Sequence, residues 1–507
     1  MNDIPGILQR GPFRSKKILI PAIILFSGIC WYLAFDLSGH FGWLIWIAPA
    51  PVLYICSRVS GGQAFVIAFL AFLIGRCSWL SYLLSVLPMA AVIILTLSLP
   101  LIFAGIVLLV RMIVRRSSSP LIASLAFPVL WSAFEFLSIL TSRDGTFGSL
   151  AYTQCNFLPV IQLASLTGIL GISFLLCFIP SAIAVSGHYY DRAATTGYLL
   201  PVTALSLLLV IGYGSIRIRN HNNRNEISVG MVALDEHAYR SFLLHNNVYT
   251  PTPEAVAHIT DLYIQQIDSL AGQGARVILL PEKVIPVNDF TDSTITGLFS
   301  NAAHRLRVTI IAGYTHAYKD HLENQSLVIS PEGTLITNYA KVNLFEGEAL
   351  EGFSPGKEPA LFDLDGVRSG TAICKDLDFQ QYMRRYGREH ASILYVPAWD
   401  FVADGWLHDR MAILRGVENG YSIVRNARQG RLTISDPYGR VLKEASSEDR
   451  KTTDLIGTIQ PRDGNTLYSR WGDWFGWIDL VAAAVLLFFL ITGRKKDQFP
   501  SKPSTIA

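Results

Sequence analysis

The segment VRSGTAICKD, residues 367–376, is the most informative stretch of this 507-residue chain. A strand-like run ends at Cys374, and the charged side chains of Lys375 and Asp376 follow it directly. The other five cysteines all precede residue 178, so Cys374 has no disulfide partner in the polar sequence around it. A lone cysteine is usually a small buried side chain, so a reactive thiol here requires a base and an oxyanion partner elsewhere in the chain.

The composition indicates that much of the chain lies in a bilayer. Hydrophobic residues make up 51% and charged residues only 16%, which is too apolar for an ordinary soluble protein of this length. The net charge of +3 is too small to indicate a nucleic-acid partner. Eight runs are long and apolar enough to be predicted as transmembrane helices: 18–35, 41–57, 63–84, 87–110, 121–140, 158–185, 197–216 and 475–492.

Positive charges in the short loops predict the orientation of these spans. The loops on one side carry almost all of them, whereas the opposite short loops contain only Arg143. The positive-inside rule then places both termini in the cytoplasm and the long polar stretch outside. The first run is expected to remain as an anchor, because it has no clear cleavage site and precedes six further spans. The residues that decide the orientation are Arg10, Arg14, Lys16, Lys17, Arg58, Arg111, Arg115, Arg116, Arg192, Arg494, Lys495 and Lys496.

The polar stretch predicts a layered α/β domain. Short aliphatic or β-branched runs alternate there with longer amphipathic segments, a pattern typical of helices that cover sheets. Strands are expected at 227–234, 276–280, 308–313, 326–330, 367–374, 392–396, 421–426 and 432–435. Helices are expected at 253–271, 294–305, 379–388 and 405–419, the last ending at Gly420. The chain thus divides into a cytoplasmic segment 1–17, a seven-helix membrane domain 18–216, an external domain 226–465, an eighth span 475–492 and a cytoplasmic tail 493–507.

Three side chains of the external domain form a chemically sensible set. Glu282 follows the apolar run 278–281, Lys341 is expected after a turn, and Cys374 ends the run described above. A carboxylate can accept the proton of a thiol, and an ammonium group can stabilise both a thiolate and an oxyanion. Taken singly, Glu282 and Lys341 would be ordinary solvated charges, and sequence separation does not show that the three meet.

The order and spacing of these residues resemble a known superfamily. The Glu-Lys-Cys triad of the nitrilases is similar to three short segments of this chain: Leu280-Pro281-Glu282, Tyr339-Ala340-Lys341 and Ile373-Cys374. Residues 408–419 also resemble the helix that follows the nucleophile in that superfamily. Seven spans, an external nitrilase-like domain and a final span resemble one member family, the apolipoprotein N-acyltransferases. Further matches to that family lie at 128–131 with Glu135, at 148–152, at 159–174 and at 466–473.

The resemblance implies a fold, a reaction and a location. It implies an αββα sandwich for the external domain and a place in the bacterial inner membrane. A phospholipid would acylate Cys374 as a thioester, and the amino terminus of a diacylated lipoprotein cysteine would then take the acyl chain. Glu282 would transfer protons and Lys341 would stabilise the oxyanion. No cofactor or metal is predicted, because the sequence has no phosphate-binding loop, dinucleotide fingerprint or metal-ligand spacing.

Three segments depart from the family's pattern. In the first strand, Ala233-Leu234-Asp235-Glu236 stands in place of the family's glutamine and asparagine. The loop after Lys341 is one residue shorter than usual and offers both Glu346 and Glu348 as a supporting carboxylate. We favour Glu348, because it follows a glycine as the family's glutamate does. After Cys374, Lys375 and Asp376 replace the family's aromatic residue and glutamate, so Asp376 is expected to take the glutamate's role with a shorter reach.

Other residues are predicted to contact substrate or to stabilise the membrane domain. Phe345, Phe353, Trp399 and Trp406 are expected to line the path of the lipid, with Asp376 as a further contact, although Trp399 is equally consistent with core packing. Glu135 lies within a span, where a carboxylate indicates either function or a buried hydrogen bond. Two other activities stay open: a membrane-tethered amidase acting on a small carbon–nitrogen substrate, and an inactive scaffold.

Overall fold

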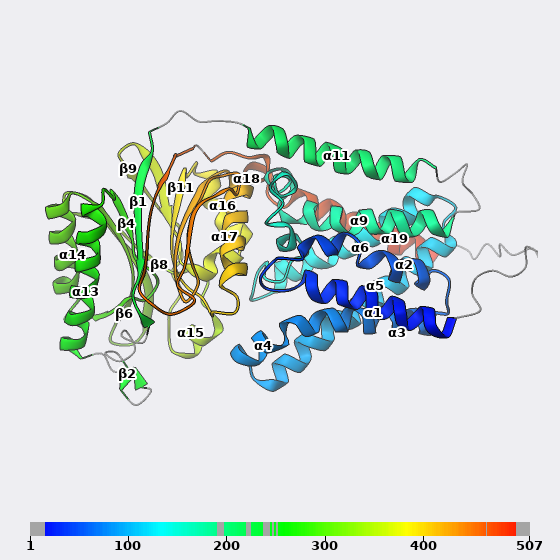
Figure 1. The fold of residues 1–507 in the computed structure, drawn as a ribbon, viewed down its shortest axis with the longest axis horizontal. Helices are drawn as coiled ribbons and strands as arrows, with labels where there is room; N and C mark the ends of the chain where they lie inside the picture. Colours follow the sequence, from blue (N-terminus) through cyan, green and yellow to red (C-terminus); the bar gives the residue numbers. More distant parts are fainter. Residues whose placement is uncertain are drawn as a thin grey trace, which may run out of the picture.

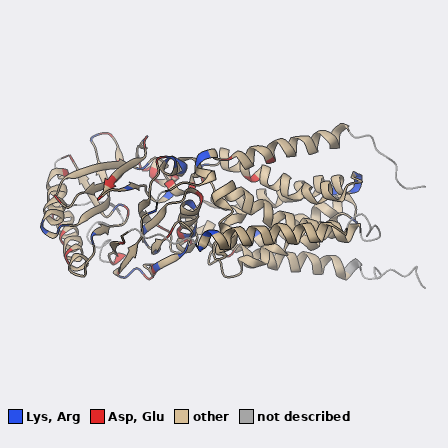
Figure 2. Ribbon diagram, turned by 90° about the horizontal axis from the view of Figure 1, so that it is seen from above, with Lys and Arg blue, Asp and Glu red and all other residues tan. Residues whose placement is uncertain are grey.

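The computed structural model describes residues 16–189, 197–219, 225–236, 244–245, 248–249, 252–289, 291–462 and 464–492. A bundle of long helices and a layered α/β domain lie end to end (Figure 1). Charged residues are frequent in the α/β domain, while the helices of the bundle carry few along their length (Figure 2). The predicted tail 493–507, most of the segment 1–17, and Arg10, Arg14, Arg192, Arg494, Lys495 and Lys496 lie outside the described residues.

Most of the predicted spans coincide with long apolar helices. By length and composition, six helices of the described chain could cross a membrane, and they match six of the eight predictions. They are α3 with α4 (Gly61–Arg76 and Leu80–Val86), α5 (Met89–Arg116), α6 (Pro120–Thr141), α9 (Ile169–His188), α11 (Leu199–Ile218) and α19 (Trp474–Thr492). The first predicted span is the shorter helix α1 (Lys16–Ala34).

Two predicted spans are interrupted by the backbone preferences of proline and glycine. The second divides into a 3₁₀ turn, η2 (Gly42–Trp46), and a short helix, α2 (Pro49–Cys56), which begins at a proline as helices often do. The span predicted over 158–185 is a continuous helix only from Ile169 onward. That segment forms α7 (Leu158–Ile161) and α8 (Ala164–Thr167), and α9 begins only after Gly168, whose φ of +67° ends the preceding turn.

The α/β domain is built from two sheets packed face to face. One has the order β15-β1-β4-β6-β7-β8, with β5 added on β6, and the other the order β14-β13-β12-β11-β10-β9. Apolar side chains from both, including Met231, Leu279 and Ile393, fill the space between them. Helices α13 (Pro253–Gly272) and α14 (Asp292–Leu306) cover the outer face of the first sheet, and α16 (Gln380–Arg388) and α17 (Gly405–Asn419) lie between the second sheet and the bundle (Figure 1). The domain is therefore a four-layer αββα sandwich.

Every predicted strand and helix of this domain overlaps an observed one. The matching strands are β1 (Ile227–Ala233), β4 (Val277–Leu279), β6 (Thr309–Ala317), β7 (Leu322–Ile329), β10 (Val367–Thr371), β11 (Ile393–Trp399), β12 (Ser422–Arg428) and β13 (Arg431–Ser435). Sequence reasoning missed β5 (Ile285–Asn288), β8 (Leu335–Ala340), β9 (Ala360–Leu364), β14 (Val441–Ser446), β15 (Thr453–Ile459) and the small pair β2 (Leu244–His245) and β3 (Val248–Tyr249). Lys341 therefore follows a strand and not an isolated turn, and the strand expected to reach Cys374 ends at Thr371.

Helix α17 joins the two parts through buried polar contacts. Arg415 and Glu418 are fully buried and form an ion pair of 3.0 Å. Glu418 accepts a hydrogen bond of 3.0 Å from the backbone N–H of Ile169, at the start of α9, and Arg415 donates one of 3.1 Å to the hydroxyl of Tyr152. Because an unpaired charge at such a site would be costly, these contacts fix the α/β domain against the bundle.

Candidate active site

Cys374 lies on a strained turn at the end of a buried strand. It begins the 3₁₀ turn η6 (Cys374–Asp378) after β10, with a φ of +43° that a residue with a side chain rarely adopts. Its thiol donates to the carbonyl oxygen of Trp399 at 3.6 Å, and part of its surface faces a cavity. The turn thus lifts the sulfur out of the sheet and exposes it to a substrate.

Asp376 fixes this turn from behind. Its carboxylate accepts hydrogen bonds from the backbone N–H of Ile373 at 3.0 Å, from the hydroxyl of Tyr339 at 2.6 Å and from the backbone N–H of Asn343 at 2.8 Å. It is completely buried and does not line the cavity. Asp376 therefore connects the Cys374 turn to the loop after Lys341 through hydrogen bonds. The prediction that it contacts substrate was wrong, because its side chain does not reach the cavity.

A buried network surrounds Lys341. Its ammonium group lies 2.8 Å from Oε1 of Glu282 and 2.9 Å from Oε2 of Glu348. The amide of Asn324 donates to the same two carboxylates, at 2.6 and 2.7 Å, and Lys283 lies 2.6 Å from Glu348. Two carboxylates, two ammonium groups and one amide thus satisfy one another in a site almost closed to bulk water.

Burial and charge set the protonation of this network. Burial raises the pKa of the Cys374 thiol well above its ordinary value, with Glu282 adding to the rise and Lys341 opposing it, so the resting sulfur holds its proton. Burial alone would lower the pKa of Lys341, but Glu282 and Glu348 raise it far above the ordinary value. For Glu348, burial acts to raise the pKa, yet the ammonium groups of Lys341 and Lys283 lower it well below its usual range.

The structure brings together six of the nine residues predicted for the site. Glu282, Lys341, Glu348 and Cys374 line one cavity of about 610 Å³, together with Phe345 and Trp399. Glu348 and not Glu346 joins the network, because the side chain of Glu346 is 65% exposed and lies 4.0 Å from Arg143.

Two predicted aromatic contacts lie outside this cavity. Phe353 packs beneath the ammonium group of Lys283, which lies 4.4 Å from the centre of its ring. Trp406 packs against Gly39 of the bundle, so closely that a β-carbon at that glycine would lie 1.8 Å from the indole. Trp406 therefore acts in the junction between the two parts, as a packing residue of α17.

The cavity extends from Cys374 into the helix bundle. Its walls there are mainly apolar and come from α3, α4, α5 and α6, with Phe72, Trp79, Leu99 and Trp131 among the lining residues. Leu95 and Ile102 of α5 also line it although their side chains are exposed on the outside of the bundle. The cavity therefore reaches the apolar surface that faces outward, as a path for a lipid chain requires.

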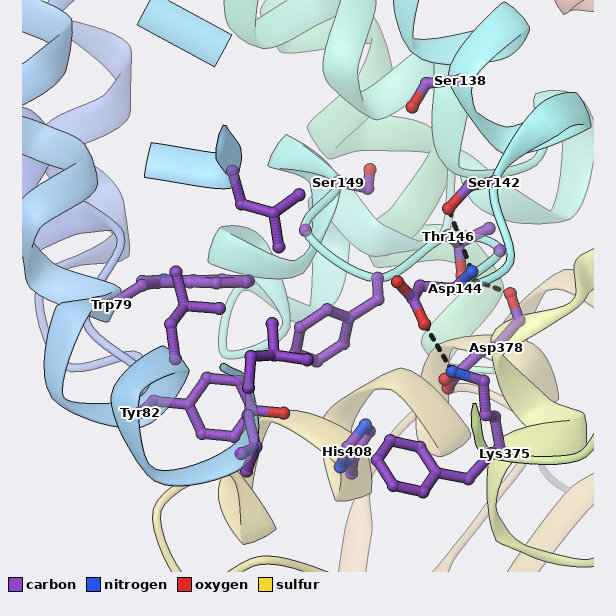
Figure 3. A pocket seen from close by; sticks show the side chains of 18 of the residues that line it. Trp79, Tyr82, Ser138, Ser142, Asp144, Thr146, Ser149, Lys375, Asp378 and His408 are labelled. Atoms are coloured by element: carbon purple, nitrogen blue, oxygen red, sulfur yellow. Dashed lines mark hydrogen bonds and ion pairs between the residues drawn. The ribbon is translucent and has the colours of Figure 1, made fainter. Parts of the chain in front are cut away.

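Sequence reasoning missed a loop of the bundle that holds the Cys374 turn. The backbone N–H and the hydroxyl of Thr146 both donate to the carbonyl oxygen of Asp378, at 2.9 and 2.8 Å. Asp144 forms an ion pair of 2.5 Å with Lys375, next to the nucleophile in sequence (Figure 3). We refer to residues 142–149 as the clamp loop. Glycine at position 145 allows its close approach.

Replacing Gly145 with alanine should loosen this clamp. Gly145 has a φ of +53°, and a β-carbon there would lie 2.3 Å from the carbonyl oxygen of Asp378, so the loop must move away. We expect acyl transfer to fall by about 10- to 100-fold, because a displacement near 1 Å at a reacting group costs about that much. Gly274→Ala is the matched control, since that glycine has a φ of +97° but open space around it. Equal activity of the two variants would contradict the role of the clamp.

Glu135 lies at the membrane end of the clamp loop. Its carboxylate accepts hydrogen bonds from Ser149, from Ser173 at 2.8 Å and from the indole N–H of Trp131 at 3.1 Å. These partners come from the loop, from α9 and from α6 itself. A carboxylate inside a span is thus satisfied by three donors and connects three segments of the bundle, which accounts for its presence there.

His408 lies where the cavity passes between the two parts. The centre of its ring lies 5.2 Å from that of Phe147 in the clamp loop, and its Nδ1 lies 3.3 Å from Asp404. Burial alone would lower the pKa of His408, but Asp404, Asp378 and Asp400 raise it to about 9. The imidazole is therefore charged at neutral pH.

The raised pKa predicts a pH-dependent contribution of His408 to stability. The folded value of about 9 exceeds the ordinary 6.5, so the contribution is fully present below pH 6.5 and is lost as pH rises to about 9. The full shift corresponds to about 3 kcal/mol. Thermal unfolding in detergent at pH 6 and pH 9.5 should show the parent losing this advantage over a His408→Gln variant, because all other groups titrate in both proteins. Parallel pH profiles would contradict the prediction.

Two family models match the chain. The model described as "Apolipoprotein N-acyltransferase N-terminal domain" matches residues 27–182, which lie in the helix bundle, and the model described as "Carbon-nitrogen hydrolase" matches residues 244–465, which lie in the α/β domain.

Known proteins are similar to the chain over different lengths. Apolipoprotein N-acyltransferase of Geobacter metallireducens is 26% identical, covering 91% of this chain and 93% of that protein, and the one of Thermotoga maritima is 23% identical, covering 88% and 89%. A 2-oxoglutaramate amidase of Bacillus subtilis is 32% identical over 31% of this chain and 66% of its own length. The crystal structure of an amidase from Nesterenkonia sp. has a TM-score of 0.41 and 17% identity, covering 49% of this chain and 94% of that one. Because the two family models match the bundle and the α/β domain in turn, and the N-acyltransferases are similar over nearly the whole length, the chain belongs to the apolipoprotein N-acyltransferases, a family of membrane acyltransferases within the nitrilase superfamily.

Proposed function

We propose that the protein moves an acyl chain from a phospholipid, through a thioester on Cys374, to the amino terminus of a diacylated lipoprotein cysteine. One observation supports this most directly: a single cavity joins Cys374, Glu282 and Lys341 to the apolar interior of the helix bundle. A water-soluble substrate would not need an apolar path from the bilayer to the thiol. Acyl chains can enter it from the bilayer without leaving an apolar environment, which avoids a cost of about 0.8 kcal/mol per methylene.

In the first half-reaction the sulfur of Cys374 attacks the carbonyl carbon of a phospholipid ester. Because the resting thiol is protonated, Glu282 takes its proton as the carbon–sulfur bond forms. Lys341, held by the two carboxylates, stabilises the developing oxyanion. The bond between carbon and the glycerol oxygen then breaks, Glu282 returns the proton to that oxygen, and a lysophospholipid leaves.

In the second half-reaction the neutral amine of the lipoprotein attacks the thioester carbonyl. Glu282 takes a proton from the attacking nitrogen, the carbon–sulfur bond breaks, and the proton passes to the departing sulfur of Cys374. The product is an amide, and the free thiol is restored. The two steps share one base and one oxyanion partner, as expected where donor and acceptor bind in turn.

We further propose that the protein lies in the bacterial inner membrane with both termini in the cytoplasm and the α/β domain outside. The basic residues of the described loops support this. Arg58 donates to the carbonyl of Gly187 at 2.6 Å, Arg111 to that of Val59 at 2.7 Å, and Arg116 to that of Leu490 at 2.7 Å. These helix ends therefore lie together, at the end of the bundle away from the α/β domain (Figure 1).

A membrane-tethered amidase is the second candidate, and its support is the similarity to the Bacillus subtilis amidase. Its chemistry would use the same residues, with water as the acceptor. An inactive scaffold is less well supported, because the Glu282–Lys341–Glu348 network and the strained Cys374 turn are intact and open to the cavity.

Intact mass measurement tests these candidates. The detergent-solubilised protein is incubated with phospholipid beside a Cys374→Ala variant. An added acyl mass on the parent alone, removed by neutral hydroxylamine or by a diacylated lipopeptide, is the expected result. Release of amine from small amides without any adduct would favour the amidase. Neither adduct nor amine release from a folded protein would favour the scaffold.

A further inference from the structure

Asp378 is a buried carboxylate in the cavity wall that the proposed reaction leaves unused. It is only 4% exposed, and within the described part of the chain its carboxylate has no hydrogen bond or ion pair. Its backbone carbonyl is held by Thr146, so the side chain is carried on a fixed turn (Figure 3). A buried carboxylate that faces a cavity and lacks a partner costs stability unless a ligand satisfies it.

A second carboxylate faces the same place from the clamp loop. Asp144 also lines the cavity, its Oδ1 bonds to Lys375, and its negative charge acts on Asp378. Figure 3 shows the carboxylate of Asp144 bonded to the ammonium group of Lys375, which lies on the same turn as Asp378. The two parts of the protein thus each contribute one carboxylate to this end of the cavity.

Charges of both signs act on Asp378. Burial raises the pKa of its carboxyl group, and the nearby Asp144 adds to the rise. The cationic groups of His408, Lys375 and Arg415 oppose it. A cationic ligand group in contact with Asp378 would favour the charged form and supply the hydrogen bonds that the carboxylate lacks.

We propose that Asp378 and Asp144 form a subsite for a primary ammonium group. Buried carboxylates require hydrogen-bond donors as well as charge, and a primary ammonium supplies three. The proposal rests on the function proposed above, in which two sources of such a group reach the cavity: the headgroup of an aminophospholipid donor and the α-amino group of the acceptor. An aminophospholipid also carries a phosphate close to its ammonium, and Lys375 is placed to bind that oxygen when Asp144 turns to the ammonium.

The position of Asp378 suits either source. It is the last residue of the turn that Cys374 begins, and both residues line the same cavity. Donor and acceptor occupy the cavity at different times in a two-step reaction. One ammonium subsite can therefore serve both.

The test compares Asp378→Asn with Asp454→Asn, a control on the exposed face of β15. Binding of non-hydrolysable diether phosphatidylethanolamine and diether phosphatidylglycerol is measured by native mass spectrometry on the full chain carrying Cys374→Ala. We expect Asp378→Asn to weaken binding of the ethanolamine lipid about tenfold relative to the glycerol lipid, which identifies the headgroup as the source. Unchanged lipid preference with normal acyl loading of the Cys374 protein, but about tenfold slower transfer to a lipopeptide amine, identifies the acceptor.

Asp144→Asn provides a second variant, because the side chain of Asp144 is 61% exposed and tolerates replacement. Like Asp378→Asn, it should weaken binding of the ethanolamine lipid relative to the glycerol lipid, or slow transfer to the lipopeptide amine. Equal weakening of both lipids, or no change in lipid preference and in transfer rate, would overturn the subsite. Since acyl loading of the parent is measured alongside, that result is distinct from a failure of the acyltransferase mechanism itself.

Discussion

Replacing Lys341 with methionine should abolish most acyl transfer and also destabilise the protein. The ammonium group lies between Glu282 and Glu348 and is 2% exposed, so its removal takes one cationic partner from each of two buried carboxylates. Asn324 still donates to both of them, and Glu348 keeps Lys283 and the backbone N–H of Phe345. Removing one partner of a buried ion pair typically costs about 3–5 kcal/mol. Loss of the oxyanion partner should lower the acylation rate by at least a further 10²- to 10³-fold, about the effect of losing one oxyanion donor elsewhere.

Thermal unfolding and acyl loading, followed by intact mass, would measure both effects in the same preparations. Lys357→Met is the matched control, because that lysine is exposed and the substitution is chemically identical. A folded Lys341→Met protein that still loads at the parent's rate would remove Lys341 from the proposed mechanism.

Glu282→Gln should lower the rate of acyl loading by about 10³-fold, within the range that a general base contributes. The stability should fall less than in Lys341→Met, because Lys341 keeps its ion pair with Glu348. Oε1 of Glu282 accepts from both Lys341 and Asn324, and the oxygen of glutamine can accept both bonds in the same place. The lost function is proton transfer, because an amide cannot take the proton that the Cys374 thiol retains at rest.

Single-turnover loading rates of this variant should be compared with those of Glu332→Gln, which lies in an exposed turn. A change confined to unfolding temperature, with loading unaffected, would indicate that Glu282 only supports the network. The two variants together separate the base from the oxyanion partner, since the loss of stability is expected to be larger for Lys341→Met.

Buried strands and their ends were predictable because apolar runs and the residues after them are local features. The runs before Glu282 and Cys374 are of this kind, and both became strands of the two central sheets. The edge strands β8 and β14 were missed because they are largely exposed and lack an apolar run. Lys341 was therefore assigned to a turn, although its position in the chain was recognised from the spacing of the triad.

Contacts between distant segments could not be read from the chain. Asn324 and Lys283 reach Glu348 from two different segments, and no local pattern marks them. Asp376 was expected near substrate, but its bonds to Tyr339 and Asn343 direct it into the core. In the membrane part, hydropathy identified the apolar runs correctly, whereas Gly168 and the prolines decided where helices begin.

The clamp loop has a consequence for how the enzyme is made. Residues 142–149 lie between α6 and α9 and leave the ribosome before residues 374–378, so the chain that forms the loop is available when the Cys374 turn is synthesised. The α/β domain is itself an insertion between α11 and α19. The Cys374 turn gains its contacts with Thr146 and Asp144 only if the helices on either side of the clamp loop have assembled in the membrane. A chain whose first helices have failed to assemble therefore carries an unclamped thiol, which ties the onset of acyl transfer to correct biogenesis in the bilayer.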